Sequence, residues 1–164
     1  MKPVVISTGI ATMDDIKLAV DACRSVGNDD ITLLKCTSSY PAPVEEANLC
    51  MIKDLSELFH VKSGLSDHTI GSISPIVAVT MGATMIEKHF IVNREIGGPD
   101  ASFSMDEQEF TQMVKDVRIA EASIGMVSYE LTDKMKSGRE FCRSLYVAEN
   151  IKKENLLLNE MYVL

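Results

Sequence analysis

The fold of this chain is decided by residues 65–90, which read LSDHTIGSISPIVAVTMGATMIEKHF. A short apolar run ends at the start of this stretch, and another occupies residues 84–90 at its end. The residues between them predict a helix over 73–81, because Pro75 is tolerated in a first turn and Gly82 follows the last residue. A strand, a helix and a second strand in this order are typical of a βαβ unit, whose two strands run parallel.

The same alternation extends over the first 125 residues. Strands are predicted at residues 3–7, 31–36, 60–64 and 84–90, and helices at 13–26, 45–59 in one or two pieces, 73–81 and 105–123. The spacing of roughly 30 residues is that of βα units, and the near-continuous apolar strands favour a parallel sheet. Four units make half of a (β/α)₈ TIM barrel. A small doubly wound sheet is the alternative, and the pattern alone does not separate the two.

Capping residues mark the ends of two predicted helices. Thr12 is placed to cap the first, and Asp14 and Asp15 follow it in the first turn, where negative charge suits the helix dipole. The last helix is predicted to begin at a capping box over residues 104–107 and to end at Gly125.

Composition limits the classes of function. The hydrophobic fraction of 46% indicates a globular protein, and a net charge of −8 argues against a nucleic-acid partner. No apolar run reaches the roughly 18 residues of a transmembrane helix, and no signal-peptide pattern opens the chain. The four cysteines lack C-x-x-C spacing, so we predict reduced, buried thiols in a cytoplasmic protein without a membrane partner.

The character of the sequence changes after the fourth unit. Residues 1–126 are predicted to form the α/β domain and residues 127–143 a basic linker. A strand over 144–148 and an apolar run over 156–158 then predict the beginning of a further domain over residues 144–164. Because the chain also opens directly into a strand, we expect it to be a fragment of a longer protein.

Two of the three histidines follow predicted strands. His68 and His89 stand at neighbouring carboxyl ends of a parallel sheet, where two imidazoles can share one divalent cation and leave open positions for water and substrate. Mn²⁺, Zn²⁺ and Fe²⁺ suit such ligands. A nearby carboxylate, Asp67 or Glu87, is expected to orient a ligating ring. The alternative is two unrelated loop histidines.

Other polar residues follow the remaining strands, and each has two interpretations. The hydroxyl and N–H groups of residues 7–9 and 37–38 are candidates for holding a phosphate near helix N-termini, although capping and turn formation use the same residues. Tyr40 and Pro41 either wall a sugar pocket or stiffen a loop. His60 lies at the opposite edge of the sheet, where a structural role is expected.

Five motifs together resemble the sialic acid synthase family. They are Ser7–Thr12, Cys36–Pro41, Ser66–Gly71, Glu87–Phe90 and Gly98–Asp100, in the order and spacing of that family over residues 2 to about 125. Within the family the chain is most similar to the pseudaminic acid synthases. Ser38 stands where many sialic acid synthases carry Asn, and Ala101 where they often carry His.

The resemblance implies a TIM-barrel enzyme that condenses phosphoenolpyruvate with an amino-sugar aldehyde, releasing phosphate and a nine-carbon keto acid. For the pseudaminic branch the aldehyde is a 2,4-diacetamido-2,4,6-trideoxy-altrose. The resemblance implies that His68 and His89 bind the metal, Mn²⁺ or Mg²⁺, and that these two residues and Asp100 form the catalytic group. It also implies that phosphoenolpyruvate is bound by Ser7, Thr37, Ser38 and Ser66, and that the acceptor sugar is bound by Tyr40 and Asp100.

The resemblance also covers only about half of the family's length. The first four barrel strands, with the family's catalytic glutamates and phosphate-binding lysines, have no counterpart here. Residues from Arg143 onward resemble the start of the antifreeze-like (SAF) domain, which in the family caps the partner subunit's site. Three hypotheses follow: the C-terminal half of a pseudaminic acid synthase, the same half of a sialic or legionaminic acid synthase, or a non-enzymatic half-barrel. In each, the chain is expected to pair with a second copy or with a complementary half.

Overall fold

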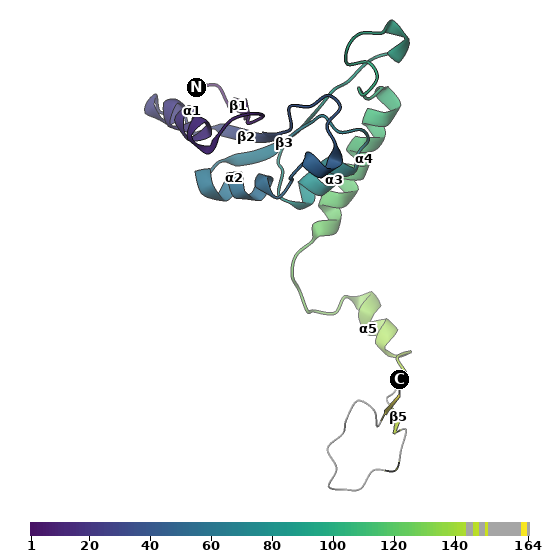
Figure 1. Ribbon diagram of the computed structural model, residues 1–164. Coiled ribbons are helices and arrows are strands. Elements are labelled where there is room, and N and C mark those ends of the chain that lie inside the picture. The colour runs from purple at the N-terminus through teal and green to yellow at the C-terminus, as the bar shows by residue number, and fades with distance from the viewer. Residues whose placement is uncertain (144–145, 148–149, 151–161, 164) are drawn as a thin grey trace. The chain divides into compact units, whose positions relative to one another are not determined.

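The computed structural model describes residues 1–143, 146–147, 150 and 162–163. The chain divides into two compact units, Met1–Gly125 and Met126–Leu164 (Figure 1). The first unit holds a four-stranded sheet with its helices, and the described residues of the second form a short helix and a two-stranded ladder.

The first unit is an α/β half-barrel. Its parallel strands are β1 (Val4–Ser7), β2 (Ile31–Cys36), β3 (Lys62–Asp67) and β4 (Ile86–Lys88), in the spatial order β1-β2-β3-β4. Its helices are α1 (Met13–Ser25), α2 (Met51–Phe59), α3 (Ile73–Thr80) and α4 (Glu107–Ile124), with 3₁₀ turns η1 (Val44–Glu46) and η2 (Arg94–Ile96). Doubly wound sheets contain a reversal of strand order. The sequential order seen here therefore favours the barrel over that alternative.

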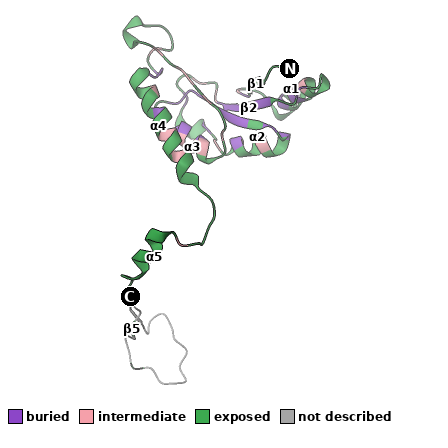
Figure 2. Ribbon diagram, turned by 180° about the vertical axis from the view of Figure 1, so that it is seen from behind, coloured by how far each residue is buried: buried purple, intermediate pink, exposed green. Residues whose placement is uncertain are grey.

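The register of the strands assigns each residue to one face of the sheet. Ile6 pairs with Leu33, and Leu65 pairs with Ile86, so these apolar side chains share a face. The helices cover this face (Figure 1). Its core consists of Ile16, Val20, Ile31, Leu33, Leu55, Phe59 and Val61, with a second cluster of Ile52, Leu65 and Ala78. Figure 2 shows the resulting burial of β2, all of whose residues are buried.

The opposite face carries the polar residues of the strand ends. Ser7 pairs with Leu34, Cys36 with Ser66, and Ser66 with Glu87, which places these side chains on the face away from the helices. In barrels this is the inner face, and its carboxyl-terminal end is where sites are built. The two end strands leave part of it open, since Val5 is 46% exposed.

Two strand boundaries differ from the sequence prediction. His60 does not open β3. It ends α2 in the left-handed conformation with φ 53°, so the strand begins at Lys62 and extends past the predicted end at residue 64 to Asp67. Strand β4 spans three residues rather than 84–90, because its ladder pairs only with Leu65–Asp67.

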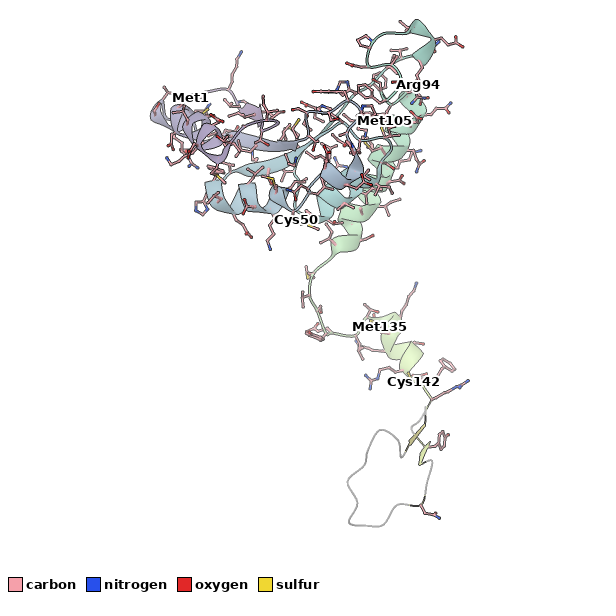
Figure 3. The ribbon with its side chains drawn as sticks, in the orientation of Figure 1. Met1, Cys50, Arg94, Met105, Met135 and Cys142 are labelled. Carbon is pink, nitrogen blue, oxygen red and sulfur yellow. The ribbon has the colours of Figure 1, made fainter. Side chains whose placement is uncertain are left out.

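Helix capping was predicted correctly at one helix and wrongly at another. Thr12 and Asp15 form the capping box of α1. The box of α4 lies two residues later than predicted, between Asp106 and Glu109, since each side chain accepts from the other's backbone N–H. Arg94, labelled in Figure 3, donates to both carboxylates and to the carbonyl of Ser104, and so ties the loop after β4 to α4.

The second unit contains a helix that was not predicted from the sequence. Helix α5 (Asp133–Arg139) lies inside the segment predicted as a linker, and Thr132 caps it. Strands β5 (Tyr146–Val147) and β6 (Tyr162–Val163) pair antiparallel. Most of the predicted strand over 144–148 and the apolar run over 156–158 lie outside the described residues. The SAF domain therefore stays a prediction.

The burial of the cysteines differs from the prediction. All four thiols are free, but only Cys36 is buried, whereas Cys50 and Cys142, labelled in Figure 3, are exposed. The prediction that all the cysteines are buried is therefore wrong, because these two residues lie just outside helix ends.

Within the described part of the chain, no helix has the length and apolar character needed to cross a membrane.

Candidate functional site

A cleft of about 670 Å³ opens at the carboxyl-terminal edge of the sheet, on the face away from the helices. It draws residues from all four strand ends. Among the residues predicted for a site, the cleft is lined by Ser7, Ser38, Tyr40, Ser66, His68 and His89. Its volume falls in the range of small-molecule sites. Thr37 and Asp100 are not part of the lining, but each contacts one of the histidines.

The two histidines face each other across neighbouring strand ends. Their ring centroids lie 5.1 Å apart and their planes meet at 67°. The Nδ1–H of His68 donates to the backbone carbonyl of Thr37 over 2.8 Å. Because a carbonyl only accepts, this bond places the proton on Nδ1 and leaves the Nε2 lone pair free.

His89 has a carboxylate near its Nδ1, at a longer distance than the partner of His68. Oδ2 of Asp100 lies 3.5 Å from that nitrogen, and the carboxylate itself is half exposed. A carbonyl or carboxylate on one ring nitrogen is the arrangement that orients metal-binding histidines through the other nitrogen. Both imidazoles can therefore present Nε2 to one ion.

The donor set supplies part of a coordination sphere. Among the residues that the structure describes, no group of three or more His, Cys, Asp and Glu side chains is placed to hold a metal. Two imidazoles at this separation fit one divalent ion with metal–nitrogen distances of about 2.1 Å. The remaining positions would fall to water or substrate oxygen.

Aromatic rings hold the two imidazoles in place. The Tyr40 ring lies 4.2 Å from His68 and 5.8 Å from His89, measured between centroids. Phe103 lies 5.0 Å from His89 and 6.0 Å from Tyr40. Phe103 is buried and was not predicted, because it belongs to the long loop after β4, whose path no periodicity indicates. Such contacts restrict ring rotation and exclude water on one side.

The carboxylates next to the histidines in the sequence do not contact the rings, contrary to the prediction. Glu87 accepts from the hydroxyl of Ser66 over 2.6 Å, within the cleft. Asp67 lies on the helix-covered side, where it accepts from Lys88 over 2.7 Å. Instead, the Thr37 carbonyl accepts from the His68 ring, and Asp100 is the carboxylate that lies beside the His89 ring.

Residues 1–129 match the NeuB family. The chain belongs to the NeuB family. It is 47% identical to a pseudaminic acid synthase of Helicobacter pylori over 157 residues, which are 95% of this chain and 46% of that protein. It is 42% identical to a pseudaminic acid synthase of Campylobacter jejuni over 159 residues, which are 97% of this chain and 46% of that protein. The family prediction is thereby confirmed.

Solved structures agree with this assignment. The N-acetylneuraminic acid synthetase of Leptospira borgpetersenii superposes with a TM-score of 0.75 at 31% identity, covering 85% of this chain and 48% of that one. The spore coat polysaccharide biosynthesis protein spsE of Bacillus subtilis gives a TM-score of 0.73 at 30% identity, covering 99% and 50%. This NeuB-family chain spans about half the length of the relatives it matches.

The hydroxyl residues in and beside the cleft of this NeuB-family chain differ in whether they donate to the backbone. Thr37 donates its hydroxyl to the Glu46 carbonyl over 3.1 Å, and Thr8 donates to the Leu34 carbonyl over 3.0 Å. Ser7 and Ser38 line the cleft and are exposed. Ser38 also lies close to Gly9, since a Cβ on that glycine would come within 2.7 Å of the serine oxygen. A side chain at Gly9 would thus push into the cleft.

Two charged residues near the cleft have displaced pKa values. Hydrogen bonds from the Thr12 hydroxyl and N–H lower the pKa of Asp15, whose carboxylate lines the cleft at the start of α1. Burial lowers the pKa of Lys35, whose ammonium donates to the Cys36 carbonyl and the Thr37 hydroxyl. Lys35 was not singled out from the sequence, although a lysine inside an apolar strand is itself a signal.

Proposed function

We propose that this chain is the C-terminal half of a phosphoenolpyruvate-dependent pseudaminic acid synthase. The observation that carries the proposal is the pair His68 and His89, whose rings lie 5.1 Å apart in one cleft at the strand ends. The identities of 47% and 42% to proteins named pseudaminic acid synthase support the substrate. Since those proteins are about twice as long, the activity belongs to the completed enzyme.

The reaction requires the protein to bind a metal ion and the phosphate and carboxylate groups of phosphoenolpyruvate. Nε2 of His68 and of His89 would hold Mn²⁺ or Mg²⁺, which when bound polarises the carbonyl of the acceptor aldehyde. The Thr37 carbonyl would hold the His68 ring through its hydrogen bond, and Asp100 would act on the His89 ring from 3.5 Å away. Ser7, Ser38 and Ser66 are the proposed contacts of phosphoenolpyruvate, with Thr37 bracing the loop.

The acceptor sugar is assigned to the outer side of the same cleft. Tyr40, a residue that is 56% exposed, and Asp100 are its proposed contacts. C3 of phosphoenolpyruvate bonds to the aldehyde carbon, water adds at C2, and phosphate leaves by cleavage of the C–O bond. The products are one nine-carbon 2-keto acid and one phosphate, so the atoms balance.

A related acceptor is the second candidate. An N,N'-diacetyllegionaminic acid synthase of Legionella pneumophila is 35% identical over 167 residues. Its lower identity ranks legionaminic or neuraminic acid formation behind pseudaminic acid formation. The third hypothesis, a half-barrel without activity of its own, describes the chain before its partner is added.

The proposed partner is a complementary half-barrel or a second copy of this chain. β1 and β4 stand at the ends of the sheet, and among the described residues neither pairs with a further strand on its outer side. Unpaired parallel edges and a partly exposed inner face favour association. Residues 144–164 are assigned to the start of an SAF domain on the resemblance alone.

Mn²⁺ titration followed by water-proton relaxation tests the site. The wild-type chain should bind Mn²⁺ weakly, because two imidazoles leave most positions to water, and binding should weaken in acid because protonated imidazole cannot ligate. His68→Ala and His89→Ala should each abolish most of it. His60→Ala is the matched control, since His60 lies at the end of α2. Equal loss in His60→Ala, or no loss in the other two, would show that the site is wrongly assigned.

A further inference from the structure

A buried ion pair joins the two strands that carry the histidines. Nζ of Lys88 lies 2.7 Å from Oδ2 of Asp67, and the two side chains are 2% and 1% exposed. Asp67 directly precedes His68, and Lys88 directly precedes His89. The ion pair lies on the helix-covered side of the sheet, whereas the histidines line the cleft on the other side.

The ammonium of Lys88 also binds backbone on the far side of His68. It donates to the carbonyl of Thr69 and, over 2.9 Å, to the carbonyl of Gly71. The free carboxylate oxygen of Asp67 accepts from the N–H of Thr69 over 2.9 Å. The Lys88 side chain, one residue before His89, therefore holds the chain both before and after His68.

A stabilising role alone does not explain this arrangement. Burying two charges costs desolvation energy that their attraction only partly returns, and a well-packed apolar pair often serves stability as well. An ion pair differs in being directional, because the donor and acceptor atoms set both distance and angle. The three oxygen acceptors around Nζ leave the Lys88 side chain one position.

We infer, on the basis of the proposed metal site, that Asp67 and Lys88 are positioning residues that set the separation of His68 and His89. Neither residue touches the cleft. They act through the chain, since each is bonded to the histidine that it places. The ring spacing of 5.1 Å is the quantity that they hold.

The test uses the full chain with both charges removed. Lys88→Met alone would leave the buried Asp67 carboxylate unpaired and endanger folding. The double variant Asp67→Asn/Lys88→Met avoids this, because the new amide oxygen can still accept from the Thr69 N–H. The matched control is Asp30→Asn/Lys62→Met, which removes an exposed ion pair between Lys62 at the start of β3 and Asp30 just before β2. Leu55→Ala controls for general destabilisation, since Leu55 is fully buried in the core away from the cleft.

Two measurements report on the histidine spacing. The first is the nuclear Overhauser effect between the ring protons of His68 and His89 in the metal-free chain, and the second is Mn²⁺ affinity. In the double variant the ring effect should disappear and the affinity should fall by about 10- to 100-fold, as for outer-shell substitutions at metal sites. Both controls should keep both signals.

The outcomes separate this inference from the metal proposal. A folded double variant that keeps the ring effect and the affinity would overturn the positioning role, as would an equal loss in Leu55→Ala. If the wild-type chain binds no Mn²⁺, the metal proposal fails. The ring effect then decides the positioning role by itself.

Discussion

Gly64 of β3 lies against the backbone of Met85, just before β4, and replacing it with alanine should disturb both strands. A Cβ at this position would lie 2.3 Å from the backbone oxygen of Met85 and 2.7 Å from Cδ2 of Leu34. The leucine side chain can shift by a rotamer change. The carbonyl cannot, because it accepts a hydrogen bond of 2.9 Å from the N–H of Leu65. Gly64→Ala therefore forces the two strands apart at this level.

The cost can be estimated from these contacts. Overpacking of a core position costs about 1–3 kcal/mol. Losing the Leu65–Met85 hydrogen bond adds about 1 kcal/mol. The sum, about 2–4 kcal/mol, is a large share of the roughly 5–15 kcal/mol that stabilises an ordinary domain. Because His89 follows β4, the same shift should also lower Mn²⁺ affinity.

Urea denaturation at fixed protein concentration measures the effect. Gly71→Ala is the control, because a Cβ there meets no atom within 4 Å and only the backbone strain of φ 82° remains, worth about 1–2 kcal/mol. Gly138→Ala should leave the first unit unchanged, since Gly138 lies in α5 with open space around it. If Gly64→Ala unfolds at the urea concentration of the wild-type chain, the close approach of β3 and β4 is refuted.

Three further predictions concern the chain as a whole. The isolated chain should release no phosphate from phosphoenolpyruvate and the altrose-type acceptor, because each absent anion-stabilising group is worth about 100-fold or more; steady release would contradict this, and adding the N-terminal half of the Helicobacter pylori relative should restore it. The chain should also self-associate through its open sheet edges, so a monomer in sedimentation that unfolds cooperatively would count against the half-barrel. Because burial lowers the pKa of Lys35 in the folded chain, the unfolded chain binds more protons, and stability should rise with pH up to about 10.4. Lys35→Met should flatten that rise in denaturation curves, and an unchanged slope would exclude Lys35 as its source.

The sequence predicted the order of elements well because local signals agree with the fold. Thr12 and Asp15 satisfy each other at the start of α1, and the run Ile31–Cys36 forms β2 at the predicted residues. The start of β3 was misplaced because His60 adopts a left-handed conformation that residues other than glycine seldom take. Helix α5 was missed because its basic residues resemble a linker and no buried face marks it.

The site was predictable where it follows strand ends and not where it depends on loops. His68 and His89 could be paired from the parallel topology alone, and the structure places their rings in contact. The Thr37 carbonyl could not be found from the sequence, since every residue has one and only the loop path selects it. Phe103 was hidden for the same reason.

Alternation at the strand ends explains why charged and cleft residues come in adjacent pairs. Lys35 precedes Cys36, Asp67 precedes His68, and Lys88 precedes His89; the first of each pair is on the helix-covered side and the second lines the cleft. An apolar residue in place of the first would serve the core as well. An apolar residue would not form the hydrogen bonds that hold the backbone carbonyl and N–H groups next to the cleft residues. The buried charged residues therefore act on the site by positioning the backbone of the cleft residues. The effect of replacing Lys35, Asp67 or Lys88 should be measured as a change in Mn²⁺ affinity as well as a change in stability.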